Sequence, residues 1–420
     1  MNAEVKPGYK LTEVGVIPED WECTTVQGIA SSVRNAIVGG PFGSDLVSDD
    51  YVSYGVPVIR GQNMGTRWVS GAFVFVSNAK ADSLESNLAH PFDLIFTQRG
   101  TLGQVSQVPE KLFDRYLVSQ SQMKLTLNRK IADPNFFYYV FSSKGQQELI
   151  RKNTIQTGIP HINLGILRTL PVQRPTYLEQ RAIAEALSDA DALIESLEQL
   201  ITKKRQIKQG AMQELLTGKK RLPGFSGEWE GKKLGDVSEM GSGGTPASSF
   251  PDYYDGDIPW VSISDMTKGG KVIQSTDRNL SGLGFANSAA QMFPAGTVLY
   301  AMYASLGECS IAGISLCSSQ AILGIRPKET LESEFLYYFL TSLKTIVKSM
   351  GQQGTQSNLN KAMVQAFQIN LPTFSEQTAI AKVLSDMDNE IDMLEIKLEK
   401  ILQLKQGMMY NLLTGKIRIV

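Results

Sequence analysis

The chain contains one long stretch twice, and this repeat limits its possible folds more than any other feature. EQRAIAEALSDADALIESLE in the first half is matched by EQTAIAKVLSDMDNEIDMLE near the end. The ranges 179–219 and 376–416 align without a gap, and more than half of their positions are identical. A proline precedes each copy, and Gly218 and Gly415 follow the last apolar residues, as helix ends prefer. Each copy is predicted to form one helix of about 35 to 40 residues, roughly 50 to 60 Å long.

Apolar residues in both copies recur at alternating spacings of three and four. Such a 3.5-residue period, sustained over several heptads, favours a coiled coil over a helix packed on a broad core. Each apolar stripe needs a partner, and the other copy is the obvious one. The predicted seam consists of Ile183, Leu187, Ala190, Ile194, Leu197, Ile201, Ile380, Leu384, Met387, Ile391, Leu394, Leu398 and Ile401.

The charges of the two copies indicate how the helices pair. Acidic residues are concentrated in the first half of each copy and basic residues in the second half. Antiparallel pairing sets acidic halves against basic halves, whereas parallel pairing sets like charges together. The sequence therefore predicts an antiparallel coiled coil formed within one chain.

The regions outside the helices are also related, but only through short anchors. The first opens on Glu-Asp-Trp-Glu at 19–22 and the second on Gly-Glu-Trp-Glu at 227–230, and each later contains a Tyr-Tyr pair. Short β-branched and aromatic runs between glycines, prolines and asparagines indicate short strands. We predict an α+β fold with two globules separated by the coiled coil and related by approximate two-fold symmetry. The predicted domains are a first globule at 1–174, a central helix at 175–220, a second globule at 221–371 and a C-terminal helix at 372–420.

Composition narrows the class of protein. The 420 residues, 42% hydrophobic and 20% charged, suit a soluble protein of two domains, and the net charge of −1 shows no global basic surplus for nucleic acid. No secretory signal or run of roughly 18 apolar residues is present, so we expect a cytoplasmic protein without membrane contact. Three cysteines without C-x-x-C spacing are expected to be buried free thiols.

Enzyme motifs are absent. The sequence has no phosphate-binding loop, no dinucleotide fingerprint, no H-E-x-x-H and no G-x-S-x-G, and its two histidines, His90 and His161, lie in unrelated contexts. We therefore expect a binding protein without catalytic, metal or cofactor sites. In the first globule, RGQN at 60–63 and TQRG at 97–100 place Arg, Gln and Asn beside glycines. These side chains make the bidentate contacts that distinguish guanine from adenine.

In its motifs and their order, the whole chain resembles the specificity (S) subunit of type I restriction-modification enzymes. The motifs are YKLTEVGVIPEDW at 9–21, the P-x-x-x-E-Q that leads each long helix, LLTGK at 215–219 and 412–416, and GGTP and IPWV in the second globule. The resemblance implies two target-recognition domains that each read one half of a gapped, asymmetric double-stranded DNA target. The helices would hold these domains apart.

The resemblance also implies partners and their cofactors. Two methyltransferase (M) subunits would dock around the helices and carry S-adenosylmethionine, and restriction (R) subunits would use ATP and Mg²⁺. Partners that surround DNA would also supply much of the phosphate contact, which fits the near-neutral charge of this chain.

Polar residues of the divergent loops are the predicted DNA contacts. In the first globule they are Arg60, Gln62, Asn63, Arg67, Gln98 and Arg99, and in the second they are Thr245, Ser262, Ser264, Lys268, Tyr300, Tyr303, Gln320 and Gln356. Two other functions remain open at this point. One is a coiled-coil scaffold whose globules bind protein or glycan, and the other is a self-sufficient methyltransferase or nuclease, which the missing motifs disfavour.

Overall fold

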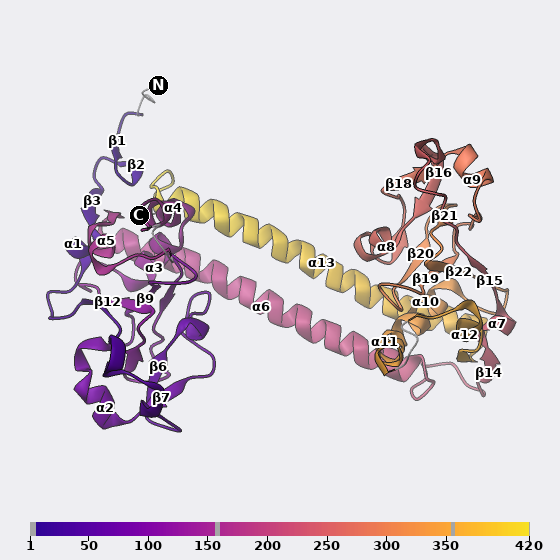
Figure 1. Cartoon of the computed structure of the whole chain (residues 1–420), viewed down its shortest axis with the longest axis horizontal. Coiled ribbons are helices and arrows are strands. Elements are labelled where there is room, and N and C mark those ends of the chain that lie inside the picture. The colour runs from indigo at the N-terminus through magenta and orange to yellow at the C-terminus, as the bar shows by residue number, and fades with distance from the viewer. Residues whose placement is uncertain (1–5, 156–159, 354–357, 420) are drawn as a thin grey trace. The chain divides into compact units, whose positions relative to one another are not determined.

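The computed structural model describes residues 6–155, 160–353 and 358–419 (Figure 1). The chain divides into two compact units: unit 1 comprises residues 1–197 and 397–420, and unit 2 comprises residues 198–396. Two long helices, α6 (Tyr177–Leu215) and α13 (Phe374–Leu413), occupy the repeated stretches. Each unit therefore contains one globule and half of each long helix, whereas the boundaries predicted from sequence separate globules from helices.

The globule of unit 1 is built from short strands and a few helices. Its strands are β1 (Tyr9–Thr12), β2 (Gly15–Pro18), β3 (Glu22–Thr25), β4 (Ile37–Gly39), β5 (Tyr51–Val52), β6 (Val56–Ile59), β7 (Val74–Val76), β8 (Leu88–Ala89), β9 (Leu94–Thr97), β10 (Val105–Gln107), β11 (Tyr116–Val118), β12 (Gln122–Leu125) and β13 (Pro171–Arg174). Its helices are α1 (Val26–Ile29), α2 (Asn78–Ser83), α3 (Pro134–Ser142), α4 (Lys144–Lys152) and α5 (Leu164–Thr169).

Two sheets dominate unit 1. One is antiparallel with the strand order β10-β9-β12-β4, and the other is mixed with the order β5-β7-β6-β11-β8, in which β11 runs parallel to β6. The strands β6, β9 and β11 are buried along their whole length, as their mostly apolar runs predict for strands covered on both faces. Strand β12 is equally buried, although two of its four residues, Gln122 and Lys124, are polar. Two small antiparallel pairs, β1-β2 and β13-β3, complete the unit.

Helix α3 joins the globule of unit 1 to the long helices. It begins at a proline, and the Asp133 side chain caps it by accepting a hydrogen bond from the Phe136 N–H (2.9 Å). Its aromatic residues are buried in one core together with Ile183 and Leu187 of α6 and Leu412 of α13. The start of α6 and the end of α13 thus pack together inside unit 1.

Unit 2 repeats this plan with different strand lengths. Its strands are β14 (Glu230–Lys233), β15 (Ser238–Ser242), β16 (Tyr254–Val261), β17 (Val272–Ile273), β18 (Arg278–Leu280), β19 (Val298–Ala301), β20 (Cys309–Ala312), β21 (Cys317–Ser318), β22 (Ile322–Pro327) and β23 (Gln368–Leu371). Its helices are α7 (Leu234–Val237), α8 (Ile263–Gly269), α9 (Gly282–Ala286), α10 (Ser333–Ser342), α11 (Lys344–Gln353) and α12 (Lys361–Gln365). The sheets have the orders β15-β22-β19-β20-β17, β18-β16-β21 and β14-β23, and β16 runs parallel to β21.

In unit 2 the end of α6 meets the start of α13. Leu215 of α6 and Ile380 and Leu384 of α13 lie in one core with the aromatic residues of α10. Ion pairs link the same helix halves: Lys204 to Glu390 (2.6 Å), Arg205 to Glu395 (2.7 Å), and Lys208 to Asp388. Inside each unit the two helix halves are therefore antiparallel, with basic side chains of one against acidic side chains of the other.

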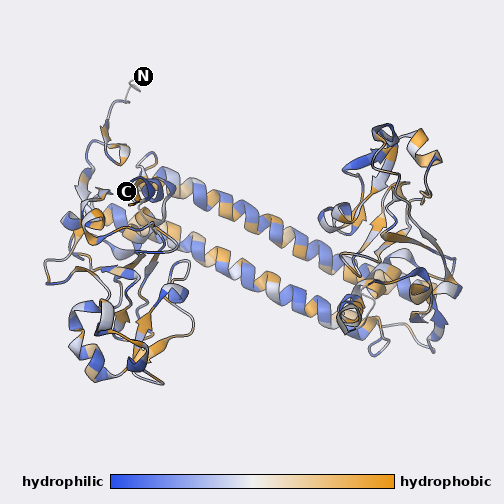
Figure 2. Cartoon of the chain, in the orientation of Figure 1, coloured by the Kyte–Doolittle hydropathy of each residue, from blue (hydrophilic) through white to orange (hydrophobic). Residues whose placement is uncertain are grey.

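The predicted seam residues are all buried or half-buried. Apolar and polar residues alternate along both long helices (Figure 2). Seven seam residues, Ile183, Leu187, Leu197, Ile201, Ile380, Leu384 and Ile391, are at most 7% exposed. The outer faces contain strongly exposed apolar residues, among them Met393 at 71% and Leu404 at 57%.

The repeated Glu-Gln pair explains why both helices begin with the same residues. Gln180 holds the start of α6 by accepting a hydrogen bond from the Asp133 N–H (2.9 Å) and donating to the Ile131 and Pro175 carbonyls (2.9 Å each). Gln377 does the same at the start of α13, with the Glu332 N–H and the Thr330 and Pro372 carbonyls.

The glutamate of each pair binds an arginine that follows the end of the other helix. In unit 2, Glu376 accepts hydrogen bonds from Arg221 Nε (2.6 Å) and Nη2 (2.7 Å), and the Arg221 guanidinium lies 5.6 Å from the Trp229 ring centroid. In unit 1, Glu179 pairs with Arg418, whose guanidinium lies 5.7 Å from the Trp21 ring. Each unit thus closes its helix pair with one Glu–Arg–Trp clamp.

Replacing Glu376 by Gln is expected to destabilise unit 2 by about 1–3 kcal/mol, because the carboxylate is 1% exposed and its charge-assisted bidentate bonds to Arg221 are lost. Glu390→Gln is the matched control on the same helix, since its pair with Lys204 is half-exposed and contributes less than about 1 kcal/mol. Urea unfolding of the full chain measures both. Equal effects for the two variants would contradict the clamp.

Candidate nucleic-acid interface

Four loops of unit 1 are tied to one another through backbone groups. They follow β4, β6 and β9 and connect β11 to β12. The Gly40 N–H donates to the Gln122 carbonyl (3.1 Å), the Ser119 N–H to the Ile59 carbonyl (3.0 Å), and the Gln98 N–H to the Ser121 carbonyl (2.8 Å). These bonds fix the relative positions of the loops whatever their side chains are.

Gly40 allows the tightest of these approaches. A Cβ atom at this position would lie 2.1 Å from the Ser119 carbonyl oxygen, so only glycine fits against that backbone. A fifth segment joins the group where the Ile162 N–H donates to the Gln98 carbonyl (3.2 Å). We call the four loops, 40–43, 60–63, 98–103 and 119–121, the loop cluster of unit 1.

Unit 2 has the same backbone bonds at corresponding residues. The Gly243 N–H donates to the Ile322 carbonyl (3.0 Å), the Ser319 N–H to the Val261 carbonyl (2.9 Å), and the Met302 N–H to the Ala321 carbonyl (2.9 Å). A Cβ at Gly243 would lie 2.3 Å from the Ser318 carbonyl oxygen, as at Gly40. The loop cluster of unit 2 comprises residues 243–246, 262–265, 302–307 and 319–321.

The loop after β6 is closed by a side chain. Asn63 Oδ1 accepts from the Arg60 N–H (3.1 Å), and Asn63 Nδ2 donates to the Ser70 and Ala72 carbonyls (3.1 and 3.0 Å). Asn63 is 0% exposed, so this predicted DNA contact holds a turn and offers no free atom to a base. In unit 2, Asp265 takes the same place and accepts from the Ser262 N–H (2.7 Å). Ser262 in turn caps α8, because its Oγ accepts from the Asp265 N–H (3.4 Å).

The other predicted residues of unit 1 divide into exposed and tethered ones. Gln62 and Arg99 are exposed on the loop cluster, and Gln62 Nε2 donates to the Ala72 carbonyl (3.1 Å). Arg60 is half-buried beside them, and Gln98 is 9% exposed. Sequence reasoning missed Gln120, which is exposed between the tethered residues Ser119 and Ser121. Its only sequence signal is its place in a polar S-Q-S-Q run between two strands.

Arg67 lies outside the loop cluster, and both of its terminal nitrogens are engaged. Its guanidinium donates to the Tyr139 hydroxyl (2.9 Å) and the Asn135 side-chain oxygen (3.1 Å), and lies 4.7 Å from the Trp68 ring centroid. The Tyr139 hydroxyl in turn donates to Asp191 of α6 (2.6 Å), which also pairs with Lys405 of α13. Burial and the Asp191 carboxylate raise the pKa of Tyr139, so its hydroxyl remains a donor.

Unit 2 has a corresponding network of hydrogen bonds and ion pairs, in which a lysine takes the place of Arg67. Lys271 donates to the Tyr338 hydroxyl (3.1 Å), which donates to Asp388 of α13 (2.7 Å), and Asp388 pairs with Lys208 of α6. Arg67 and Lys271 therefore connect a loop of the globule to the long helices of their own unit. In each unit the connection passes through the second tyrosine of the Tyr-Tyr pair, Tyr139 or Tyr338.

The residues of unit 2 that were predicted to contact DNA also differ in their exposure and in their hydrogen bonds. Thr245 and Gln320 are exposed neighbours on the loop cluster, where the Gln320 N–H donates to Thr245 Oγ1 (3.3 Å). Tyr303, 38% exposed, and Ser264 lie on the same cluster. Lys268 is exposed on α8 and pairs with Asp277 (3.2 Å).

Two predicted residues of unit 2 do not reach this surface. Tyr300 is 0% exposed on β19, between β22 and β20 in the middle of its sheet, so its ring belongs to the core. Gln356 lies outside the described residues.

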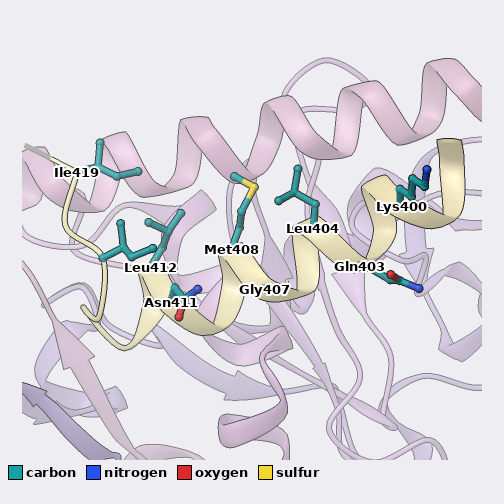
Figure 3. Close-up of a pocket in the computed structure, with 9 residues that line it drawn as sticks. Lys400, Gln403, Leu404, Gly407, Met408, Asn411, Leu412 and Ile419 are labelled. Carbon is teal, nitrogen blue, oxygen red and sulfur yellow. The ribbon is translucent and has the colours of Figure 1, made fainter.

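A shallow apolar groove of about 630 Å³ lies along the end of α13 in unit 1. Leu404, Met408 and Leu412 project to one side of the helix there, while Gln403 and Asn411 project to the other (Figure 3). Ile417 and Ile419, which follow the helix, also line the groove. Gly407 also lines the groove, and a Cβ at this position would meet no atom within 4 Å.

Among the residues that the structure describes, no group of three His, Cys, Asp or Glu side chains could hold a metal ion, and none of the helices has the length and apolar character of a membrane span. Cys309 and Cys317 are buried free thiols as predicted, and Cys23 is half-buried. Exposed polar side chains lie on both loop clusters.

This arrangement defines a recognition protein of mixed α/β architecture with two repeated domains, and comparisons identify the family. Residues 18–209 and 226–403 match the type I restriction modification DNA specificity domain family. The chain belongs to this family of non-catalytic subunits, and it recognises DNA sequence.

Individual relatives match this chain over nearly its whole length or over part of it. The chain is 24% identical to the type I restriction enzyme MjaVIII specificity subunit of Methanocaldococcus jannaschii, over 96% of this chain and 94% of that one. It is 30% identical to the MjaIX specificity subunit of the same organism over 39% of each chain. In fold it is similar to the crystal structure of the type I restriction-modification S subunit from M. genitalium, with a TM-score of 0.58, 18% identity and coverage of 97% and 98%.

Proposed function

We propose that each unit reads one half of a gapped, asymmetric double-stranded DNA target through its loop cluster. The observation that carries this proposal is the shared backbone frame with different side chains. Where unit 1 presents Gln62, Arg99 and Gln120, unit 2 presents Ser264, Tyr303 and Gln320. Different donors and acceptors on one frame are what two different half-sites require, because base edges in the major groove are distinguished by their pattern of donors and acceptors.

The two long helices would set the distance between the half-sites as one antiparallel coiled coil. This is supported by the antiparallel packing of helix halves inside each unit and by the length of α6 and α13, 39 and 40 residues. A continuous helix of that length extends about 60 Å. The pairing would relate the two units by approximate two-fold symmetry.

Two methyltransferase subunits would dock on the helices, and restriction subunits would join them. S-adenosylmethionine would then belong to the methyltransferase subunits, ATP and Mg²⁺ to the restriction subunits, and no cofactor to this chain. The apolar groove at Leu404 supports docking on α13, because exposed apolar patches mark interaction sites. Ile207, 47% exposed, holds the position of Leu404 in the other copy of the repeat.

Mapping methylated sites in host DNA with and without this chain tests the proposal. We expect one gapped, asymmetric set of sites to depend on the chain, and Arg99→Ala to relax only one half of it by about 1–3 kcal/mol per affected base pair. Ser264→Ala is the matched change on the other cluster and should affect the other half. Methylation that is unchanged when the chain is removed would refute the proposal.

A further inference from the structure

Phe42 is an exposed aromatic residue on the loop cluster of unit 1. Its side chain is 60% exposed, although its neighbours Gly40 and Pro41 are buried. Single exposed apolar residues are common on protein surfaces, so exposure alone assigns nothing. Two further observations point to a role for Phe42. One is the fixed backbone of its loop, and the other is the different residue at the corresponding place in unit 2.

The backbone fixes Phe42 on both sides. On one side, Gly40 is hydrogen-bonded to Gln122 and lies against the Ser119 carbonyl. On the other, Gly43 adopts φ +57°, and the Asp45 N–H donates to the Phe42 carbonyl (3.1 Å) to start a 3₁₀ turn at Gly43–Asp45. A side chain with only two rotatable bonds on a fixed backbone loses little entropy on binding, which is typical of an interface anchor.

Unit 2 has a polar residue at the corresponding place. Gly40 and Gly243 make the same backbone bond, so counting two residues onward aligns Phe42 with Thr245. Thr245 Oγ1 accepts from the Gln320 N–H and is part of the local hydrogen bonding. Phe42 makes no such contribution to its loop, because its side chain has no polar atom.

We propose that Phe42 is a specificity-determining residue of unit 1 that makes an apolar contact with the bases of its half-site. This rests on the proposed function of the loop clusters. An apolar side chain in a groove contacts the thymine methyl group or enters a base step and unstacks it. Either contact favours some base sequences over others. Thr245 of unit 2 could offer only its small methyl group to a thymine, and it has no ring to enter a base step.

The test uses the full chain assembled with its methyltransferase subunits. Phe42→Ala is expected to weaken binding to a duplex carrying the mapped target by about tenfold, and to relax one position in one half of the methylated set. The other half should remain unchanged, and Phe42→Leu should retain most of the preference. Tyr54→Ala is the control, because Tyr54 is 82% exposed in the same unit but outside the loop cluster.

Two duplex probes distinguish the two contacts. If Phe42 touches a thymine methyl, replacing that thymine by uracil should reproduce the loss, and Phe42→Ala should add nothing to it. If Phe42 unstacks a step, 2-aminopurine placed there should brighten on binding wild-type protein and less with Phe42→Ala.

The proposal is overturned if Phe42→Ala methylates the same sites with the same affinity, or if it only weakens capture of the methyltransferase subunits. Failure of the broader proposal would look different, because the wild-type chain itself would then direct no methylation. Thermal unfolding should be unchanged by the substitution, since the side chain is mostly in solvent.

Discussion

Duplicating one heptad in each long helix is expected to lengthen the gap in the DNA target by about three base pairs. Repeating 194–200 in α6 and 391–397 in α13 adds about 10.5 Å of helix, against 3.4 Å per base pair. Seven residues preserve the coiled-coil seam, so both loop clusters keep their structures and both half-sites keep their sequences. Mapping methylated sites in a host that carries the variant measures the new gap.

The same heptad inserted into α6 alone is the control. The seam would then be out of register with α13, and acidic side chains such as Asp388 and Glu390 would lose Lys208 and Lys204. We expect this variant to unfold more easily and to direct no methylation. A double insertion that leaves the gap unchanged would contradict the role of the helices as a spacer.

Replacing Leu404 and Ile207 together by Glu is expected to abolish capture of methyltransferase subunits. Burying a new carboxylate at each docking position should cost at least about 2 kcal/mol, or roughly thirtyfold in affinity. Leu404→Glu alone should leave one methyltransferase subunit per chain, because Ile207 occupies the same position in the other copy of the repeat. Light scattering of the purified complexes gives the stoichiometry.

Leu402→Glu is the matched control for docking, because Leu402 is 41% exposed on the same helix but does not line the groove. It should keep both subunits. All three exposed positions tolerate a charge without loss of fold, so thermal unfolding should not change. Full occupancy in the double variant would show that the partners bind elsewhere.

The long helices could be predicted from sequence because local signals specify them. A 3.5-residue apolar period, prolines before and glycines after each repeat were enough to place α6 and α13. Gly218 and Gly415 indeed have positive φ, +71° and +66°. The antiparallel packing inside each unit also follows from the charge gradient, since Lys208 meets Asp388 and Lys405 meets Asp191.

Which of the predicted contact residues have free side chains was harder to predict, because long-range contacts decide this. The sequence around Asn63 predicts a polar turn. Only the fold brings the Ser70 and Ala72 carbonyls close enough to accept both hydrogen bonds of the Asn63 side-chain NH₂ group. Arg67 is engaged by Tyr139, which is distant in sequence. Tyr300 is buried because its strand has neighbours on both sides, and pairing of strands is not visible in a local pattern.

The loop clusters are held by main-chain groups, and this has an evolutionary consequence. Every residue except proline supplies both a backbone N–H and a carbonyl, so the exposed positions can mutate to other residues as long as the glycines remain at Gly40 and Gly243. Selection for a new target would then need only a few surface changes in one half of the gene. The other half, together with every partner that binds the helices, would be inherited unaltered.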